Sequence, residues 1–313
     1  MRVILVLASW LLVVPALGQD GKEQDSTPRV AITFDKLPYM EPLGFWAPRE
    51  VGRAILRTLE EYSAPATGFV VEEKIVDRPE TVAVLEDWIA AGHQLGNNTW
   101  GYVDLNEVDE DEFWWQTRDG LRTLRRFVKL GVEPILFRFP MLHEGSTPGK
   151  KHRVAYMLRR AGYVSVPATV FFEDYEFNFV LRDIENEPEK VSRLRGIYLA
   201  AFEGALSYAE RQAEAVFGRP VAQILRLHPG IATAQFLDGV LATLRHKGYE
   251  FVTVQEALED SAYQEVEDYV GPLGLSFIDR VAATRGLPFD PDQGRLSRRE
   301  ITAILADADA PEQ

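Results

Sequence analysis

The stretch AITFDKLPY, residues 31–39, places an apolar run directly before two adjacent charges. The residues up to Phe34 are typical of a buried strand, Asp35 and Lys36 follow it, and Pro38 prevents the strand from continuing. In α/β proteins, side chains at the carboxyl ends of strands point into the ligand crevice. This strand end therefore predicts either a functional pair of charges or an ordinary salt bridge, and the rest of the chain has to distinguish the two.

Six further strand-like stretches follow, with helical patterns between them. The predicted strands are residues 30–34, 66–71, 94–97, 135–138, 164–168, 224–227 and 251–254. The helical patterns include residues 48–63, 78–92 and 234–248, and a longer helical insertion covers 187–217. Strands that alternate with helices indicate an α/β fold with a parallel sheet, either a barrel or a doubly wound sheet.

The composition limits the classes of site and partner. The chain has 313 residues, 46% of them hydrophobic, which is ample for a large core. It contains no cysteine, which excludes disulfides, zinc–thiolate sites and thiol nucleophiles. The 34 basic and 48 acidic residues give a net charge of −14. Because such a surface repels phosphate backbones, we expect no nucleic-acid partner.

The first residues are predicted to be a targeting segment. Residues 1–18, MRVILVLASWLLVVPALG, combine one basic residue, an apolar run and a small-x-small ending, which is the pattern of a secretory signal peptide. The apolar run is shorter than the roughly 20 residues that span a bilayer. We therefore expect export to the periplasm or cell exterior, with no membrane span after cleavage. Residues 19–28 are predicted to be a linker, 29–260 the main domain and 261–313 a helical C-terminal extension.

Four later strand ends carry polar and aromatic residues in a fixed order. They read AGHQLGNNTWGYVDL (91–105), FRFPMLHEG (137–145), VPATVFFEDYEF (166–177) and ILRLHPG (224–230). Together with TFD, these blocks resemble the polysaccharide deacetylase (NodB-homology) family over residues 29–258, and YVGPLG in the tail resembles one branch of it. The resemblance implies a distorted (β/α) barrel with a short C-terminal helical tail, and a partner that is an acetylated glycan, chitin-like or peptidoglycan-like.

The resemblance also implies an acid–base pair. Asp35 matches the catalytic base of the family, and Arg138 matches the arginine that orients this base. His228 matches the general acid, and Asp174 matches the carboxylate that tunes the histidine. Acid–base groups of this kind transfer protons during acyl hydrolysis.

The substrate pocket and the metal site match less completely. Tyr175 stands where a tryptophan commonly lines the acetyl pocket, and the backbone N–H of Met141 matches an oxyanion donor. The family implies zinc or another divalent metal, held by an aspartate and two histidines, but Lys36, Asn98 and Tyr102 occupy those positions. An ammonium opposes a divalent cation, and the other two offer poor donors. The sequence therefore predicts no metal ligands and no cofactor, with these three residues left to line the substrate pocket.

Two interpretations of the missing metal follow. We expect Lys36 to occupy the vacated metal position and to neutralise Asp35, as the metal would. The alternative is a relocated metal site formed by His143, Glu144 and His228, although nothing in their spacing requires it. His143 is in either case expected to lie at the substrate pocket.

Three functions remain open at this stage. We favour a pseudoenzyme that binds carbohydrate after the loss of metal-dependent hydrolysis. The first alternative is an active N- or O-deacetylase, which is a hydrolase, with a relocated metal or with none. The second alternative is a scaffold with a vestigial crevice. Residues 289–300, FDPDQGRLSRRE, partly match a calcium-binding loop, but the first two acidic residues are out of register. A capped surface helix is the favoured interpretation there.

Overall fold

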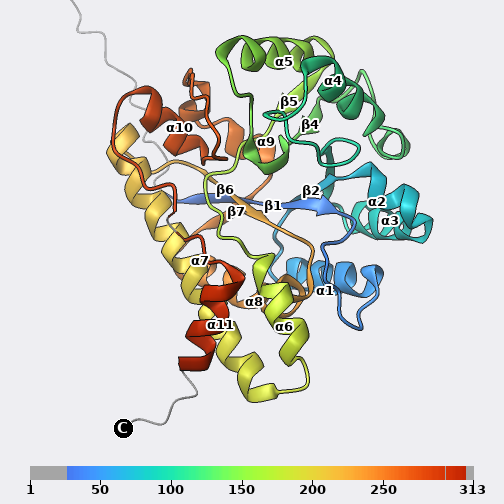
Figure 1. Cartoon of the computed structure of the whole chain (residues 1–313), viewed down its shortest axis with the longest axis vertical. Helices are drawn as coiled ribbons and strands as arrows, with labels where there is room; N and C mark the ends of the chain where they lie inside the picture. Colours follow the sequence, from blue (N-terminus) through green and yellow to red (C-terminus); the bar gives the residue numbers. More distant parts are fainter. Residues whose placement is uncertain (1–26, 293, 308–313) are drawn as a thin grey trace, which may run out of the picture.

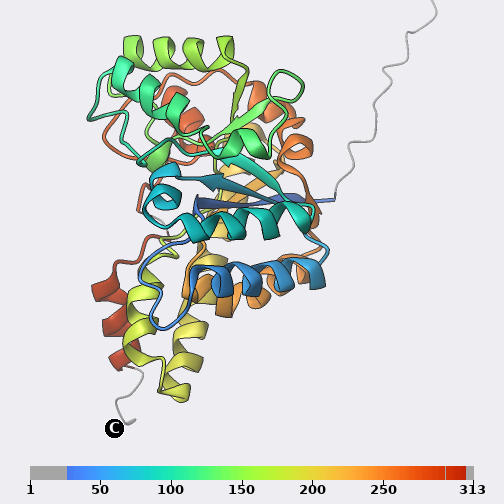
Figure 2. The same cartoon turned by 90° about the vertical axis from the view of Figure 1, so that its right-hand side faces the viewer.

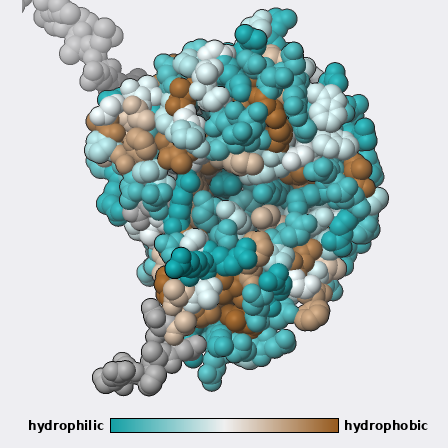
Figure 3. All heavy atoms as spheres, viewed as in Figure 1, coloured by the Kyte–Doolittle hydropathy of each residue, from teal (hydrophilic) through white to brown (hydrophobic). Residues whose placement is uncertain are grey.

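The computed structural model of the chain describes residues 27–292 and 294–307. The predicted signal peptide, residues 1–18, and residues 19–26 of the predicted linker lie outside the described residues. Within the described ranges, no helix is long and apolar enough to cross a membrane. On the face drawn in Figure 3, hydrophilic residues cover most of the surface, and apolar residues gather in separate patches.

Seven parallel strands form one curled sheet at the centre of the molecule (Figures 1 and 2). They are β1 (Arg29–Leu37), β2 (Ala66–Val70), β3 (Gln94–Asn97), β4 (Ile135–Phe137), β5 (Tyr163–Ser165), β6 (Gln223–Leu227) and β7 (Glu250–Val252). Their order is β5-β4-β3-β2-β1-β6, and β7 also pairs with β1. Every predicted strand is present, and the sheet forms the distorted (β/α) barrel that the resemblance implies.

Helices surround this sheet. They are α1 (Pro48–Glu61), α2 (Glu72–Asp77), α3 (Val82–Ala90), α4 (Glu110–Asp119), α5 (Pro148–Arg160), α6 (Glu176–Ile184), α7 (Pro188–Phe217), α8 (Ile231–His246), α9 (Val254–Leu258), α10 (Phe277–Thr284) and α11 (Arg298–Asp307). In Figure 1, α4 and α5 lie above the sheet, and α1, α6, α8 and α11 lie below it. The predicted helical insertion is confirmed as α7, which ends at Gly218, a glycine with a φ of 67°.

The end of β1 separates its two charged side chains. The strand continues past its predicted end at Phe34 as far as Leu37, and most of it is buried. Its pairing register with β2 shifts between these two residues, and Lys36 adopts a left-handed φ of 64°. Successive residues of a strand face opposite sides of a sheet. The irregular strand end therefore leaves Asp35 in the interior, while Lys36 reaches the pocket described below.

The C-terminal extension packs against the main part of the fold. Phe277, Ile278 and Val281 of α10 share an apolar cluster with Ala213 and Val216 of α7. In Figure 1, α10 lies beside the upper end of α7, and α11 lies beside its lower part. Burying apolar side chains on both partners stabilises this docking by the hydrophobic effect. The extension is consequently held against the C-terminal part of α7.

The start of α11 confirms the predicted capped helix. The hydroxyl and the backbone N–H of Ser297 donate to Glu300 Oε2 at 2.6 and 2.8 Å, and the Glu300 N–H donates to Ser297 Oγ at 3.3 Å. This reciprocal pair is a capping box. Glu300, which a calcium loop would need as its last ligand, is thus engaged by the helix terminus.

Candidate functional site

The carboxyl ends of the strands bring the sequence-predicted site residues together. Asp35 and Lys36 lie at the end of β1, Asn98 and Tyr102 follow β3, and Arg138 to His143 follow β4; Asp174 and Tyr175 precede α6, and His228 follows β6. Parallel strands place their carboxyl ends at one edge of the sheet, which explains the convergence of segments that are far apart in the sequence.

Asp35 is buried between two guanidinium groups. Arg138 Nη1 lies 3.2 Å from Asp35 Oδ1, and Arg226 Nε lies 2.8 Å from Asp35 Oδ2. Burial acts to raise the pKa of this carboxyl, but the charges of Arg138 and Arg226 outweigh it, and the pKa lies below its ordinary value. Asp35 is therefore a fully engaged carboxylate.

The prediction that Lys36 neutralises Asp35 is wrong, because Asp35 pairs with Arg138 and Arg226. The Lys36 ammonium lies 4.0 Å from the centroid of the Tyr102 ring, and it forms no ion pair with any carboxylate of the described residues. Burial, followed by the charge of Arg226, lowers the pKa of Lys36 to about 8. The physical reason is the irregular end of β1, which turns the two neighbouring side chains apart. Arg226, a residue that the sequence interpretation missed, is the second counterion of Asp35.

His228 is held on both ring nitrogens. Its Nδ1 lies 2.7 Å from Asp174 Oδ1, and its backbone N–H donates to Asp174 Oδ2 at 2.7 Å. On the other side, Arg226 Nη2 lies 3.3 Å from His228 Nε2. A carboxylate only accepts and a guanidinium only donates, so this network assigns the proton to Nδ1 and leaves Nε2 as an acceptor. Arg226 consequently connects the Asp35 carboxylate to the His228 imidazole.

The backbone donor expected for an oxyanion is also engaged. The N–H of Met141 donates to the phenol oxygen of Tyr102 at 3.1 Å. Burial raises the pKa of Tyr102, so the phenol is neutral at physiological pH. Lys36, Tyr102 and Met141 all adopt positive φ values, of 64°, 57° and 56°. Such conformations cost free energy in residues with a side chain, and they cluster at functional sites.

The residues at the family's metal positions do not fit a divalent metal. Asn98 Oδ1 accepts the Lys36 N–H at 3.2 Å, and Asn98 Nδ2 donates to the Arg138 carbonyl at 2.9 Å. The carboxamide therefore has its donor and its acceptor in use, the Tyr102 phenol is neutral, and the third position carries an ammonium. Among the described residues, no group of three His, Asp or Glu side chains could hold a metal ion.

The structure gives no support to a relocated metal site. His143 Nδ1 lies 2.8 Å from Asp104 Oδ2. Glu144 instead forms ion pairs with Arg280 at 2.6 Å and with Lys151 at 3.5 Å. A carboxylate neutralised by two cations is a poor ligand for a metal. His143, Glu144 and His228 therefore do not converge as a ligand set.

A pocket of about 370 Å³ opens above these residues. Six residues of the sequence prediction line it: Lys36, Tyr102, Met141, His143, Tyr175 and His228. Asp35, Arg138, Asp174 and Asn98 do not line the pocket; each is at most 2% exposed and lies behind the lining residues.

Other parts of the wall come from residues that were not among the predicted site residues. Three of them lie in the blocks 166–177 and 224–230, next to predicted site residues: Phe171, Glu173 and Arg226. Four more come from the C-terminal extension: Pro272, Leu273, Gly274 and Arg295. For Arg226 a signal existed: residues 226 and 228 face the same side of a strand because side chains alternate. For the extension, the YVGPLG motif, residues 269–274, was the local signal, but its place in the pocket wall depends on long-range packing.

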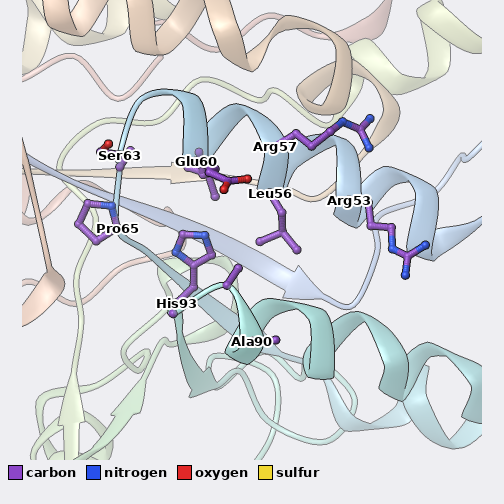
Figure 4. A pocket seen from close by; sticks show the side chains of 12 residues that line it. Arg53, Leu56, Arg57, Glu60, Ser63, Pro65, Ala90 and His93 are labelled. Carbon is purple, nitrogen blue, oxygen red and sulfur yellow. The ribbon is translucent and has the colours of Figure 1, made fainter.

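A second, larger pocket lies elsewhere, at the amino ends of the strands. It measures about 740 Å³ and is bordered by α1 and α3 (Figure 4). His93 lies between Pro65 and Ala90 in this view, and its Nδ1 accepts the Ala66 N–H at 3.3 Å. No acid–base pair like that of His228 and Asp174 is recorded among its described lining residues. We therefore place the candidate functional site at the smaller pocket.

Comparison with known proteins agrees with the family resemblance of the sequence. The family model for polysaccharide deacetylase matches residues 22–172. The chain is 24% identical over 233 residues to a peptidoglycan-N-acetylglucosamine deacetylase of Bacillus cereus, covering 73% of this chain and 87% of that protein. These two matches support membership of the polysaccharide deacetylase (NodB-homology) family.

Matches to solved structures were also found. Peptidoglycan deacetylase PdaC from Bacillus subtilis is 20% identical, with a TM-score of 0.48, and the match covers 74% of this chain and 91% of that one. A protein from Bacillus anthracis described as a CE4 family pseudoenzyme is 17% identical, with a TM-score of 0.47, and the match covers 74% of this chain and 66% of that one.

Proposed function

We propose that this protein is an exported carbohydrate-binding member of its family that does not carry out metal-dependent deacetylation. The observation that carries this proposal is the position of Arg226, which contacts both Asp35 and His228. Its guanidinium supplies the positive charge at the centre of the site but has no coordination position for water or substrate.

Neither half of the expected acid–base pair is free to act. A general base needs an accessible oxygen and a pKa near the working pH. Asp35 is buried, has both oxygens engaged, and has a lowered pKa. A general acid needs a proton on the nitrogen that faces the substrate, whereas His228 Nε2 faces Arg226. This arrangement favours binding over hydrolysis.

The pocket retains features that suit a sugar. Its volume of about 370 Å³ falls within the range of roughly 300–1,000 Å³ that is typical of small-molecule sites. Tyr175 forms part of its wall, with its ring centroid 5.2 Å from that of His228. Aromatic rings bind the apolar faces of sugars, and polar groups fix their orientation. Because the curated relative is named for peptidoglycan N-acetylglucosamine, we propose an acetylated amino-sugar glycan as the ligand.

We further propose the organisation and location of the chain on the same grounds. Residues 1–18 act as a signal peptide, and residues 19–28 link it to the fold. Residues 29–260 form the NodB-like domain, and residues 261–313 form an extension that supplies one wall of the pocket. Export to the periplasm or cell exterior would bring the pocket to cell-wall or environmental glycans.

Calorimetry with chitotetraose, a neutral acetylated amino-sugar oligomer, tests the proposal. The wild type should release heat on binding, and Tyr175→Ala should weaken the affinity. Tyr156→Ala is the matched control, because Tyr156 is 57% exposed on α5 and does not line the pocket. Acetate release should be absent in the same samples. Turnover by the wild type would favour the active deacetylase, and a lack of binding across several acetylated glycans would favour the scaffold.

A further inference from the structure

The pocket is richer in cations than the rest of the molecule. The whole chain has a net charge of −14, yet the lining contains Lys36, Arg226 and Arg295 against a single carboxylate, Glu173. Its two histidines are paired with carboxylates that do not line the pocket. A concentration of positive charge on an acidic protein points to an anionic ligand, since the remaining surface would repel one.

Two of these three cations are already engaged. Arg226 contacts Asp35 and His228. Arg295 Nη2 donates to the Gly274 carbonyl at 2.5 Å, and its Nε lies 3.9 Å from Glu173 Oε1. These contacts hold both guanidiniums in the wall while their charge continues to act on the pocket.

The Lys36 ammonium is the cation that remains available. Within residues 27–292 and 294–307, the ammonium contacts the face of the Tyr102 ring, which accepts no conventional hydrogen bond. An ammonium carries three N–H donors and needs acceptors when it leaves water. Its backbone is held at a φ of 64° by the bulged end of β1, so its position is set by the fold and not by an ion pair.

The protein keeps this cation at a cost to stability. Burial lowers the pKa of Lys36 to about 8, and the nearby charges of Arg226 and Lys74 act in the same direction, against weaker opposing effects of Asp35 and Glu41. A residue that is retained against the stability of the fold is often retained for function.

We propose that the pocket binds a sugar that carries a carboxylate, and that Lys36 is its principal anion-binding residue. The inference rests on the proposed glycan-binding function and narrows the class of ligand. A charge-assisted hydrogen bond joins the Lys36 ammonium to the carboxylate, while Tyr175 contacts the sugar ring. The carboxylate could belong to a uronic acid within an acetylated chain, or to a lactyl ether on an amino sugar, and both present the same chemistry.

Calorimetry with matched ligand pairs tests this inference. The first pair is the hyaluronan tetrasaccharide, which alternates N-acetylglucosamine with glucuronate, and the same tetrasaccharide with its carboxylates reduced to alcohols. The second pair is the N-acetylglucosaminyl-N-acetylmuramic acid disaccharide and its carboxamide. The wild type should prefer the acid by about tenfold in at least one pair, the effect expected of a hydrogen bond to a charged group. The pair that shows the preference identifies the source of the carboxylate.

Variants at Lys36 separate this inference from the proposed function. Lys36→Met should reduce the ratio of affinities for acid and neutral ligand to about one, and Lys36→Arg should retain a preference for the acid. Lys129→Met, at a lysine with a 75% exposed side chain, should leave the ratio as in the wild type. Equal affinities within both pairs, or a preference for the acid that survives in Lys36→Met, would overturn this inference. Chitotetraose binding in the same experiments would still support the proposed function. A lack of binding by every ligand, chitotetraose included, would overturn both.

Discussion

Replacing Lys36 by methionine should stabilise the protein. The ammonium is largely buried, and it contacts the Tyr102 ring without a carboxylate partner among the described residues. Methionine has a similar length and shape and carries no charge that has to be desolvated. The variant therefore removes the unfavourable burial of a charge and keeps most of the packing.

The size of the gain follows from the pKa of Lys36, which is lowered from 10.5 to about 8. Each pKa unit corresponds to about 1.36 kcal/mol, so keeping the ammonium charged at pH 7 costs the folded state about 3 kcal/mol. Loss of the contact with the Tyr102 ring removes about 1 kcal/mol of stabilisation. We expect a net increase in the free energy of unfolding of about 2 kcal/mol.

The gain should depend on pH in a defined direction. Because the folded pKa is lowered, the unfolded chain binds more protons than the folded protein between pH 8 and 10.5. The free energy of unfolding of the wild type therefore rises with pH through this window, because Lys36 loses its buried charge, and Lys36→Met should not show this rise. The difference between the two proteins should be largest below pH 8 and should shrink toward pH 10.5.

Urea unfolding at pH 7, 9 and 10 provides the measurement. Lys129→Met is the control, because the Lys129 side chain is 75% exposed, and exposed charges contribute about 0–1 kcal/mol. If Lys36→Met is instead less stable than the wild type by more than about 1 kcal/mol, the ammonium has a carboxylate partner. The pairing with Asp35 that the sequence suggested would then be correct.

Three other perturbations give distinct results. Arg226→Leu leaves Asp35 with one counterion and should lower the free energy of unfolding by about 3–5 kcal/mol in urea titrations, with part of the loss recovered by adding Asp35→Asn. Burial lowers the pKa of His93 from 6.5 to about 4, so the unfolded chain binds more protons than the folded protein as the pH falls through this window. The free energy of unfolding should therefore fall between pH 7 and 4, and His93→Gln should make this pH dependence flatter. A Cβ on Gly274 would lie 1.8 Å from the Met141 carbonyl oxygen, so Gly274→Ala should displace the pocket wall and weaken chitotetraose binding.

Each of these perturbations has a matched control. Lys247→Met removes a surface cation that pairs with Glu210 at 3.1 Å, and it should change stability by less than about 1 kcal/mol. His246→Gln alters an exposed histidine at the end of α8 and should keep the acid slope of the wild type. Gly196→Ala lies in α7 with nothing within 4 Å of the added Cβ, and it should stabilise the helix by about 1 kcal/mol. Equal effects in a variant and its control would contradict the corresponding reasoning.

The sheet could be predicted from the sequence because its strands are buried, short and regularly separated by helical patterns. The sequence predicts a strand over residues 94–97, and the structure gives β3 the same bounds. The long helix α7 was predictable from its length and from the glycine that ends it. Pairs such as His228 with Asp174 were implied by the family order of the blocks, and the structure places these two side chains 2.7 Å apart.

The charge balance of the site could not be predicted in the same way. Lys36 stands at a metal-ligand position of the family, which predicts that it neutralises Asp35, whereas the bulge and the positive φ turn the two side chains apart. Arg226 becomes the counterion because β6 pairs directly with β1 and brings residue 226 opposite Thr33. Strand order and register of this kind are tertiary properties, and a strand of five residues carries no local signal for them.

The proposed lack of metal-dependent hydrolysis is tested most directly by elemental analysis of the purified protein, combined with acetate release from chitotetraose in the presence of added zinc. With Lys36, Asn98 and Tyr102 at the metal positions, the wild type should contain far less than one zinc per chain and release no acetate. The triple variant Lys36→Asp, Asn98→His and Tyr102→His should bind zinc, because it restores the ligand types of the family. About one zinc per wild-type chain, together with acetate release that a chelator abolishes, would contradict the account.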